Sequence, residues 1–376
     1  MARALVVGGG IGGLAAGAAL QHRGWEVTVV ERGAALEAVG AGLALAPNAL
    51  KALDVIGLGD RVRARSALQG EAGIMGRDGR WISRTSAEAA EARYGDPTFV
   101  LHRAALVELL ASALTPGTLR LGVDVTAVDA VAGQVTAGGE DLTADLVVAA
   151  DGLNSQIRRA LVPGHPGPVY AGATSWRMVV PPPPPDGVRA GEIWGRGQVF
   201  GMAPLGDGRV YCYAMAVTPA GARAADERAE VLRLFGSWSP PVPQLVAGAE
   251  TVLRTDLRCL DTPLRRFHYG RVALLGDAAH AMTPHLGQGA CQAIEDAVVL
   301  ASVADRPDGL ARYTALRLPR TTAVAAASRR IGRLTTLSGA AAVWARDNAM
   351  RLAGRVGPNL VLRQMDPVLG WRPPTG

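Results

Sequence analysis

Five glycines occupy six consecutive positions near the start of the chain, in the stretch GGGIGG. Gly8, Gly10 and Gly13 give the spacing G-x-G-x-x-G between a strand-like run, 4–7, and a helix-like run, 14–22. Glycine reaches the φ values of such a turn cheaply and leaves room for a phosphate, while the helix N-terminus supplies free N–H groups. The loop therefore predicts a pyrophosphate site, whose candidate residues are Gly8, Gly10, Ile11, Gly12 and Gly13.

An acidic residue ends the next strand-like run. The stretch WEVTVVER contains Glu31, eighteen residues after Gly13, where a carboxylate can bind the ribose hydroxyls of an adenosine. Strand, glycine loop, helix, strand and terminal acid together predict a dinucleotide-binding site.

Two further Asp/Gly pairs follow apolar runs later in the chain. Asp151 and Gly152 follow LVVAA, and Gly276 and Asp277 follow VALL. Asp277 can bind hydroxyls of an extended ligand or cap the helix-like run behind it, because aspartate is favoured at helix N-caps. The loop HLGQGA then opens another helix-like run, whose N-terminal N–H groups favour negative charge. We expect a second backbone cradle there, formed by Gly287, Gly289 and Ala290.

These three blocks resemble the fingerprints of the single-component, or class A, FAD-dependent aromatic monooxygenases, the family typified by p-hydroxybenzoate hydroxylase. The resemblance extends from residue 3 to about 305 and rests most on the block GD…P…GQG…AIEDA. It implies non-covalent FAD, with the pyrophosphate on the first loop, the ribityl chain on Asp277 and the flavin ring at the second cradle.

The resemblance also implies FAD contacts for three other residues. Arg32 would contact the adenosine, Arg103 would lie near the phosphates and ribityl chain, and Asp151 would lie near the pyrophosphate and the approach of the nicotinamide cofactor. A solvated surface side chain is the alternative for the arginines, and a strand-end turn is the alternative for Asp151. Ala149 stands where many members of the family have glycine.

The chemistry that the resemblance implies needs no second nucleotide domain. NADPH or NADH would visit transiently and reduce FAD, and O2 would add to give a flavin 4a-hydroperoxide. Its distal oxygen would hydroxylate or epoxidise an electron-rich aromatic or heteroaromatic small molecule, with secondary metabolism as one setting. The protein's part in such chemistry is mainly to exclude water and to orient the substrate.

Candidate substrate-binding residues lie on two strand-like runs. Alternation in RVYCYAMAV puts Tyr211 and Tyr213 on one face; the resemblance puts a tyrosine near Tyr211 beside the substrate, and a packed aromatic ladder is the alternative. Val199, on the opposing run, stands where urate-hydroxylating relatives carry an arginine. The pocket is therefore expected to suit a neutral, fairly apolar ring, which disfavours a urate-like acid.

Two residues just before the second cradle complete the catalytic candidates, which are His285, Tyr211 and Pro284. His285 is predicted to lie at the mouth of the flavin ring, where it could orient or deprotonate a phenol or an N–H group. An ordinary loop histidine is the alternative. Pro284 resembles part of the cradle that holds the oxygenated flavin.

The elements that must position these residues predict an α/β fold. We expect a Rossmann-like FAD-binding domain of the p-hydroxybenzoate hydroxylase type, with an inserted β-sheet substrate domain and C-terminal helices. The FAD-binding domain would span 1–165 and 268–376, and the β-rich substrate domain 166–267, with 70–100 a further candidate for it. The proline run at 181–187 marks an exposed connection.

Composition narrows the remaining classes. The net charge of +6 comes almost entirely from arginine and forms no basic stripe, so nucleic acid is not an expected partner. The three cysteines lie far apart, and no metal site is expected. No run approaches the roughly 18 apolar residues of a membrane span, and the first strand leaves no room for a signal peptide, so we expect a cytoplasmic protein without an integral membrane segment.

Three rival functions share parts of this pattern. A flavin-dependent halogenase would need a tunnel lysine and a W-x-W-x-I-P segment, and the chain has neither, since Lys51 is its one lysine and lies on an early helix-like run. A flavin-dependent dehydrogenase or reductase of a cyclic substrate stays an alternative. A non-enzymatic redox sensor would tolerate a degraded second cradle, yet that block is intact.

Overall fold

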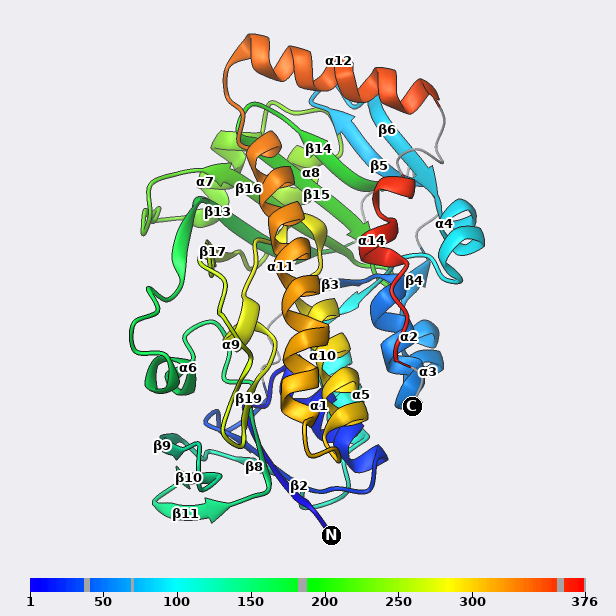
Figure 1. Cartoon of the computed structure of the whole chain (residues 1–376). Coiled ribbons are helices and arrows are strands. Elements are labelled where there is room, and N and C mark those ends of the chain that lie inside the picture. The colour runs from blue at the N-terminus through cyan, green and yellow to red at the C-terminus, as the bar shows by residue number, and fades with distance from the viewer. Residues whose placement is uncertain (37–40, 69–70, 182–187, 357–361, 375–376) are drawn as a thin grey trace.

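The computed structural model describes residues 1–36, 41–68, 71–181, 188–356 and 362–374. Within these ranges a six-stranded sheet runs through the lower half of the molecule in Figure 1, in the order β18-β19-β12-β1-β2-β8. Its strands are β1 (Arg3–Val7), β2 (Glu26–Glu31), β8 (Leu119–Leu121), β12 (Leu146–Ala149), β18 (His268–Tyr269) and β19 (Val272–Leu274). All pairings are parallel except that of β18 with β19. Continuous apolar runs such as LVVA suit this arrangement, because its strands are buried on both faces.

Helices α1 (Ile11–His22) and α10 (Gly289–Val303) pack against each other over this sheet (Figure 1). Gly12 allows the close approach, since a Cβ there would lie 2.8 Å from Leu275 Cδ2 and 3.2 Å from Ala293 Cβ. The N-termini of both helices therefore lie close to the carboxyl ends of the parallel strands.

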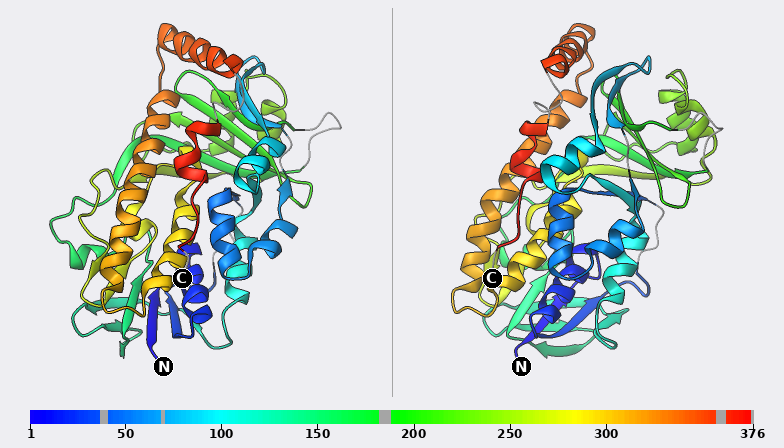
Figure 2. Two further views of the ribbon diagram at one scale, coloured as in Figure 1. Left: turned by 45° about the vertical axis from the view of Figure 1, so that its right-hand side comes forward. Right: turned by 90° about the vertical axis from the view of Figure 1, so that its right-hand side faces the viewer.

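A seven-stranded sheet forms the upper half, in the order β17-β13-β16-β15-β14-β5-β6 within the described residues (Figures 1 and 2). Its strands are β5 (Glu71–Gly76), β6 (Trp81–Ser86), β13 (Val169–Val180), β14 (Ala190–Trp194), β15 (Gln198–Pro204), β16 (Val210–Val217) and β17 (Leu253–Cys259). The segment 71–86 thus pairs with strands far from it in sequence, through β5 and β14.

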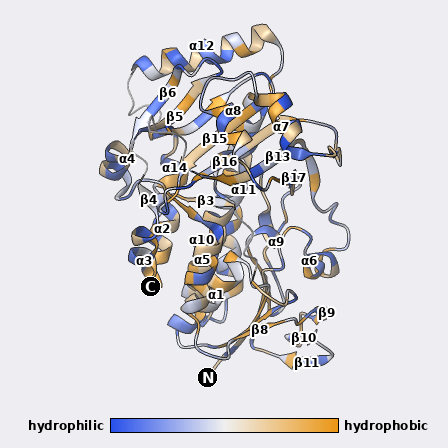
Figure 3. Ribbon diagram, turned by 180° about the vertical axis from the view of Figure 1, so that it is seen from behind, coloured by the Kyte–Doolittle hydropathy of each residue, from blue (hydrophilic) through white to orange (hydrophobic). Residues whose placement is uncertain are grey.

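The two faces of this sheet differ. One face packs on α7 (Glu227–Phe235) and α8 (Val242–Ala247) through a cluster that includes Phe200, Cys212 and Trp238. Figure 3 shows the hydrophobic residues gathered on β15 and β16. Tyr213 and Met215 belong to the other face, which confirms the predicted alternation of β16.

Two small sheets and the remaining helices complete the described chain. The sheets are β3 (Gly42–Leu45) with β7 (Phe99–His102) and β4 (Ala67–Leu68), and β9 (Val125–Asp129) with β10 (Gln134–Ala137) and β11 (Glu140–Thr143). The other helices are α2 (Pro47–Val55), α3 (Gly59–Ala64), α4 (Ala87–Tyr94), α5 (Arg103–Ser112), α6 (Gln156–Leu161), α9 (Asp277–His280), η1 (Pro284–Leu286), α11 (Gly309–Thr335), α12 (Ala340–Val356) and α14 (Asp366–Leu369).

The long helix α11 connects the two halves. It runs beside α10 at its lower end and reaches the seven-stranded sheet at its upper end, where α12 lies along β6 (Figures 1 and 2). The α/β fold class is confirmed, whereas the division into domains at 165 and 268 stays a prediction. Most of the proline run, 182–187, lies outside the described residues. No helix within the described ranges is long and apolar enough to cross a membrane.

Candidate active site

The glycine loop forms a tight turn between β1 and α1. Gly8 has φ +113°, and a Cβ there would lie 2.4 Å from the carbonyl oxygen of Ala150. A Cβ on Gly13 would lie 1.9 Å from the carbonyl oxygen of Gly8. At Gly10, in contrast, no described atom beyond the adjoining residues lies within 4 Å of the Cβ position. The loop is thus closed against β12 on one side and open at the N-terminus of α1, as a pyrophosphate cradle requires.

Glu31 is fixed by the same loop. Its Oε2 accepts the Gly9 N–H at 2.6 Å, and its Oε1 accepts the Gly33 N–H at 2.8 Å. Each carboxylate oxygen keeps a second lone pair, so ribose hydroxyls can still donate to it. Arg32 is exposed, and its predicted adenosine contact stays a prediction.

Asp277 is a carboxylate that the folded chain leaves unbonded. It is the first helical residue of α9, the N-cap is Gly276, and no side-chain cap hydrogen bond forms. The predicted alternative of a helix cap is therefore wrong, because the side chain is one residue too late to cap. The carboxylate makes no hydrogen bond with any described residue. Asp277 is exposed, and Arg103 and Arg158 lie near enough to favour the charged form of its carboxylate.

Two arginines, Arg103 and Arg158, act electrostatically on this carboxylate, and Asp151 lies near Arg158. Arg103 is the first residue of α5, and its N–H donates to the Ala41 carbonyl at 2.9 Å. Arg158, which sequence reasoning missed, is buried and donates to the carbonyls of Ala278 (3.0 Å) and Leu153 (2.7 Å). Asp151 Oδ2 accepts an N–H from α6, whereas Oδ1 is buried without a hydrogen-bond partner. These polar groups fit a ligand rich in hydroxyls and phosphates.

The second cradle lies between η1 and α10. Gly287 has φ +62°, and the nearest atom to its Cβ position is Ala44 Cβ at 3.8 Å. At Gly289 no described atom beyond the adjoining residues and the helix's own backbone lies within 4 Å of the Cβ position, and Ala290 behind it is partly exposed. Pro284 is exposed at the start of η1. The N-terminus of α10 therefore faces open space, where its N–H groups can stabilise an anionic group.

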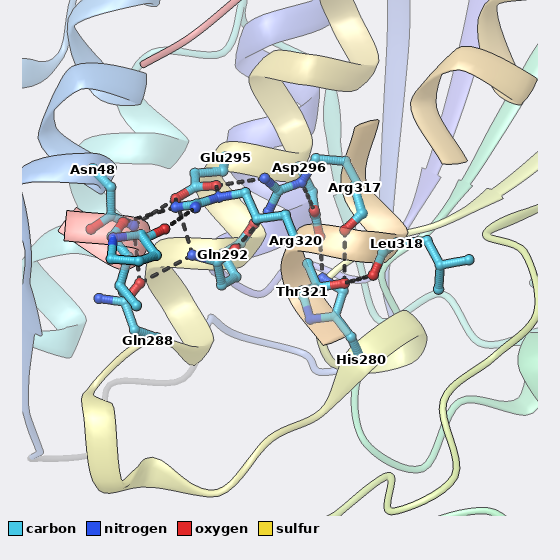
Figure 4. Close-up of polar contacts among 12 residues, drawn as sticks. Asn48, His280, Gln288, Gln292, Glu295, Asp296, Arg317, Leu318, Arg320 and Thr321 are labelled. Carbon is cyan, nitrogen blue, oxygen red and sulfur yellow. Dashed lines mark hydrogen bonds and ion pairs between the residues drawn. The ribbon is translucent and has the colours of Figure 1, made fainter. Parts of the chain in front are cut away.

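A buried polar network ties the second cradle and the residue before Asp277 to the helices behind them (Figure 4). Asp296 accepts the N–H of Gly276 at 3.0 Å and a hydrogen bond from Arg317 Nε at 2.6 Å. Asn48 donates to Gln288 at 3.0 Å and to Glu295 at 2.6 Å. The network thus holds Gly276, next to Asp277, and Gln288, next to Gly289.

An apolar cavity of about 230 Å³ lies between the large sheet and the small β3-β7 sheet. Tyr211 and Tyr213 line it, with ring centres 5.7 Å apart, so they form a tilted pair and also face the cavity. Its other lining residues are Ala44, Ala72, Thr85, Ser86, Ala87, Ala90, Pro97, Thr98, Val100, Ala190, Gly191, Glu192, Met202 and Ala203. Ala44 also lies nearest to the Cβ position of Gly287, so the cavity adjoins the second cradle.

Three sequence candidates lie outside this lining, namely Val199, His285 and Pro284. Val199 is buried in an apolar cluster with Trp194 and Met215. The ring of His285 packs against α11, where a Cβ on Gly332 would lie 2.8 Å from His285 Cε1. Both ring nitrogens are buried without hydrogen-bond partners among the described residues, and burial lowers the pKa of His285 to about 4.

The depressed pKa of His285 makes folding pH-dependent. Protonation opposes folding, so the stability contributed by the neutral ring is complete above pH 6.5, the ordinary value, and is lost as pH falls toward 4. Between pH 7 and pH 4.5 we expect the His285→Gln variant to lose about 2–3 kcal/mol less of its free energy of unfolding than the wild type loses. Urea unfolding at pH 4.5 and pH 7 measures it, with exposed His22→Gln as the control. An unchanged pH dependence in His285→Gln would contradict the buried, neutral ring.

Taken together, the parallel sheet, the two glycine cradles and the unbonded carboxylate define a dinucleotide-binding protein. Comparison with known proteins names the family. Residues 1–328 match the family described as FAD binding domain. The chain is 40% identical to aurachin C monooxygenase/isomerase of Stigmatella aurantiaca, with 93% of each chain covered. It is 37% identical to 3-amino-4-hydroxybenzoate 2-monooxygenase of Streptomyces cremeus, covering 93% of this chain and 91% of the relative.

A solved structure agrees with this assignment. The Klebsiella pneumoniae protein HpxO, complexed with FAD and uric acid, superposes with a TM-score of 0.90 at 29% identity, covering 98% of this chain and 97% of that one. The chain belongs to the FAD binding domain family and is a class A FAD-dependent aromatic monooxygenase. The predicted resemblance and the predicted FAD cofactor are thereby confirmed.

The unbonded Asp277 gives a direct test of the FAD site. If its carboxylate accepts ribityl hydroxyls, Asp277→Ala loses a charge-assisted hydrogen bond of about 1.5–3 kcal/mol, and FAD affinity falls about 10- to 100-fold. Fluorescence titration of the apoprotein with FAD measures the change, and Asp305→Ala, at an exposed position on the surface, is the control. Equal affinities in the two variants would show that Asp277 does not hold the cofactor.

Proposed function

We propose that this protein uses NAD(P)H and O2 to insert one oxygen atom into a neutral aromatic or heteroaromatic ring. The ring would bind in the cavity that Tyr211 and Tyr213 line. Bound FAD would supply the redox chemistry by accepting a hydride and activating O2. One observation carries the proposal: Ala44 both lines the cavity and lies nearest to Gly287 of the second cradle. A ring in the cavity would thus lie next to the flavin.

The chain's own residues would bind, orient and exclude water. We propose that Gly8, Gly10, Ile11, Gly12, Gly13 and Glu31 hold the adenosine diphosphate half of FAD, that Asp277, Arg103 and Asp151 hold its centre, and that Gly287, Gly289 and Ala290 face its ring. Burial raises the pKa of Tyr211 to about 12, so its hydroxyl stays protonated at neutral pH and can donate a hydrogen bond to a substrate. His285 would remain neutral and support the cradle from behind.

The lining of the cavity favours an uncharged substrate. None of its described residues is Lys, Arg or His, so a carboxylate would lose its hydration without gaining a counter-charge. A neutral ring of the size found in small natural products would bury its surface there. The relative at 40% identity, which is named for aurachin C, supports a role in secondary metabolism. Nucleic acid is not a proposed partner.

Substrate-dependent oxidation tests this function. FAD-loaded protein is given NADPH or NADH with a panel of phenols, indoles and polycyclic rings, and NAD(P)H and O2 consumption are recorded together. We expect the right ring to accelerate both in equal amounts and to appear as a hydroxylated or epoxidised product. Peroxide is measured in parallel, because its formation without product would count against the assignment.

A further inference from the structure

Glu192 is an acidic residue inside the apolar cavity. It lies on β14 opposite Gly201 of β15, and Gly201 lies opposite Tyr213 of β16, so the three share one row on the same face of the sheet. A Cβ on Gly201 would lie 2.0 Å from Tyr213 Cζ. The tyrosine ring therefore crosses the strand over Gly201, and its hydroxyl donates to Glu192 Oε1. Only glycine at 201 permits this contact.

A second donor fixes the other oxygen. Trp194 Nε1 donates to Glu192 Oε2 at 2.6 Å. The Trp194 ring is itself buried and lies 5.2 Å from the guanidinium of Arg346, which is anchored on the Leu334 carbonyl at 3.0 Å. The carboxyl group is thus held at two points by neutral donors on rigid elements. Such positioning is typical of groups that recognise a ligand.

No cation from the described part of the chain neutralises this carboxyl group. Within the described residues Glu192 forms no ion pair. Arg177, beside Tyr213 on β13, donates instead to Thr255 at 2.9 Å. Burial raises the pKa of Glu192, against the hydrogen bonds from Tyr213 and Trp194. Burying a carboxyl group without a counter-charge lowers the stability of the folded protein. A hydrogen bond from a bound ligand would offset part of this cost.

The remaining hydrogen-bonding capacity of Glu192 is available to a ligand. Each of its oxygens accepts one hydrogen bond from the protein and has a further lone pair. The cavity lining around it is mainly apolar and small, including Ala72, Ala190 and Met202. A ligand that offered no donor there would leave the carboxyl oxygens unsatisfied, which costs free energy on binding.

We propose that Glu192 determines the specificity of the cavity by accepting a hydrogen bond from an N–H or O–H group on a neutral ring substrate. The inference rests on the proposed function and narrows it to rings that carry such a donor. Rings whose donor is methylated, and rings that carry a carboxylate, are rejected. A hydrogen bond to the carboxyl group would also raise electron density in the ring, which suits electrophilic oxygen transfer.

Matched ligands test this role without knowledge of the natural substrate. The probes are 1-naphthol with 1-methoxynaphthalene, indole with 1-methylindole, and 1-naphthoate, and binding to FAD-loaded protein is followed by the flavin absorbance. We expect each donor to bind about 10-fold more tightly than its methylated partner, and 1-naphthoate to bind more weakly than 1-naphthol. Equal affinities within the pairs, or no binding by either donor, would overturn the proposal.

Glu192→Gln provides the second arm, with exposed Glu250→Gln as the control. We expect the preference for donors to fall below about threefold in Glu192→Gln and to persist in the control. A preference that persists in both variants would overturn the role of Glu192. If Glu192→Gln fails to fold, the wild-type pairs still decide. The same spectra report FAD content, so a protein that does not bind FAD refutes the proposed function and not this inference.

Discussion

Gly10→Ala is expected to weaken FAD binding about 10-fold or more without changing the thermal stability of the apoprotein. No described atom beyond the adjoining residues lies within 4 Å of the Cβ position at Gly10, so the added methyl group would meet the ligand and no other part of the described protein. Gly13→Ala is expected to weaken FAD binding about 100-fold and also to destabilise the apoprotein, because its Cβ would lie 1.9 Å from the Gly8 carbonyl oxygen. Both estimates reflect the loss of one or two charge-assisted hydrogen bonds to phosphate.

Fluorescence titration and thermal unfolding of the apoproteins measure the two effects separately. Gly164→Ala is the control, since its Cβ position is also open but lies on the exposed surface. We expect neither quantity to change there. Normal FAD affinity in Gly10→Ala would mean that the phosphates do not approach the loop at this point.

Arg317→Met is expected to lower the free energy of unfolding by about 3–5 kcal/mol. Arg317 is 1% exposed and pairs with both Glu295 and Asp296, which are fully buried. Without Arg317, the buried carboxylate of Asp296 loses this positive partner, whereas Glu295 keeps its ion pair with Arg320 (Figure 4). Urea unfolding of the apoprotein measures the loss.

The same helix carries a matched control. Arg312 pairs with Asp308 at 2.7 Å, but both side chains are more than half exposed. Arg312→Met is therefore expected to cost less than about 1 kcal/mol, because exposed ion pairs contribute little. Equal losses in the two variants would contradict a structural role for the buried network.

The cofactor half of the site could be predicted from sequence because its residues follow one another along the chain. Gly8, Gly13 and Glu31 belong to one strand-loop-helix-strand unit, and their spacing fixes their geometry. The predicted contact of Asp277 with the ribityl chain stays a prediction, and the structure shows that Asp277 follows the N-cap of α9 by one residue. Alternation likewise predicted the shared face of Tyr211 and Tyr213.

The positions of the substrate-binding residues depend on the order of the strands in the large sheet, which the sequence does not specify. Glu192 lines the cavity because β14 lies two strands away from β16, and the glycine at 201 lets Tyr213 reach it. A single acid within the run AGEIW was the available signal. Val199 is on the predicted face, but it lies further along the strand, among residues that pack near α11. Arg158 was missed because arginine is common throughout this chain.

Isotope transfer from labelled O2 tests the central claim most directly. With a substrate that supports coupled turnover, we expect one labelled atom to appear in the organic product and the other in water, and turnover to stop without oxygen. If turnover proceeded equally well under nitrogen with a dye as electron acceptor, and the product gained no label, the monooxygenase assignment would be wrong and a flavin-dependent dehydrogenase would replace it.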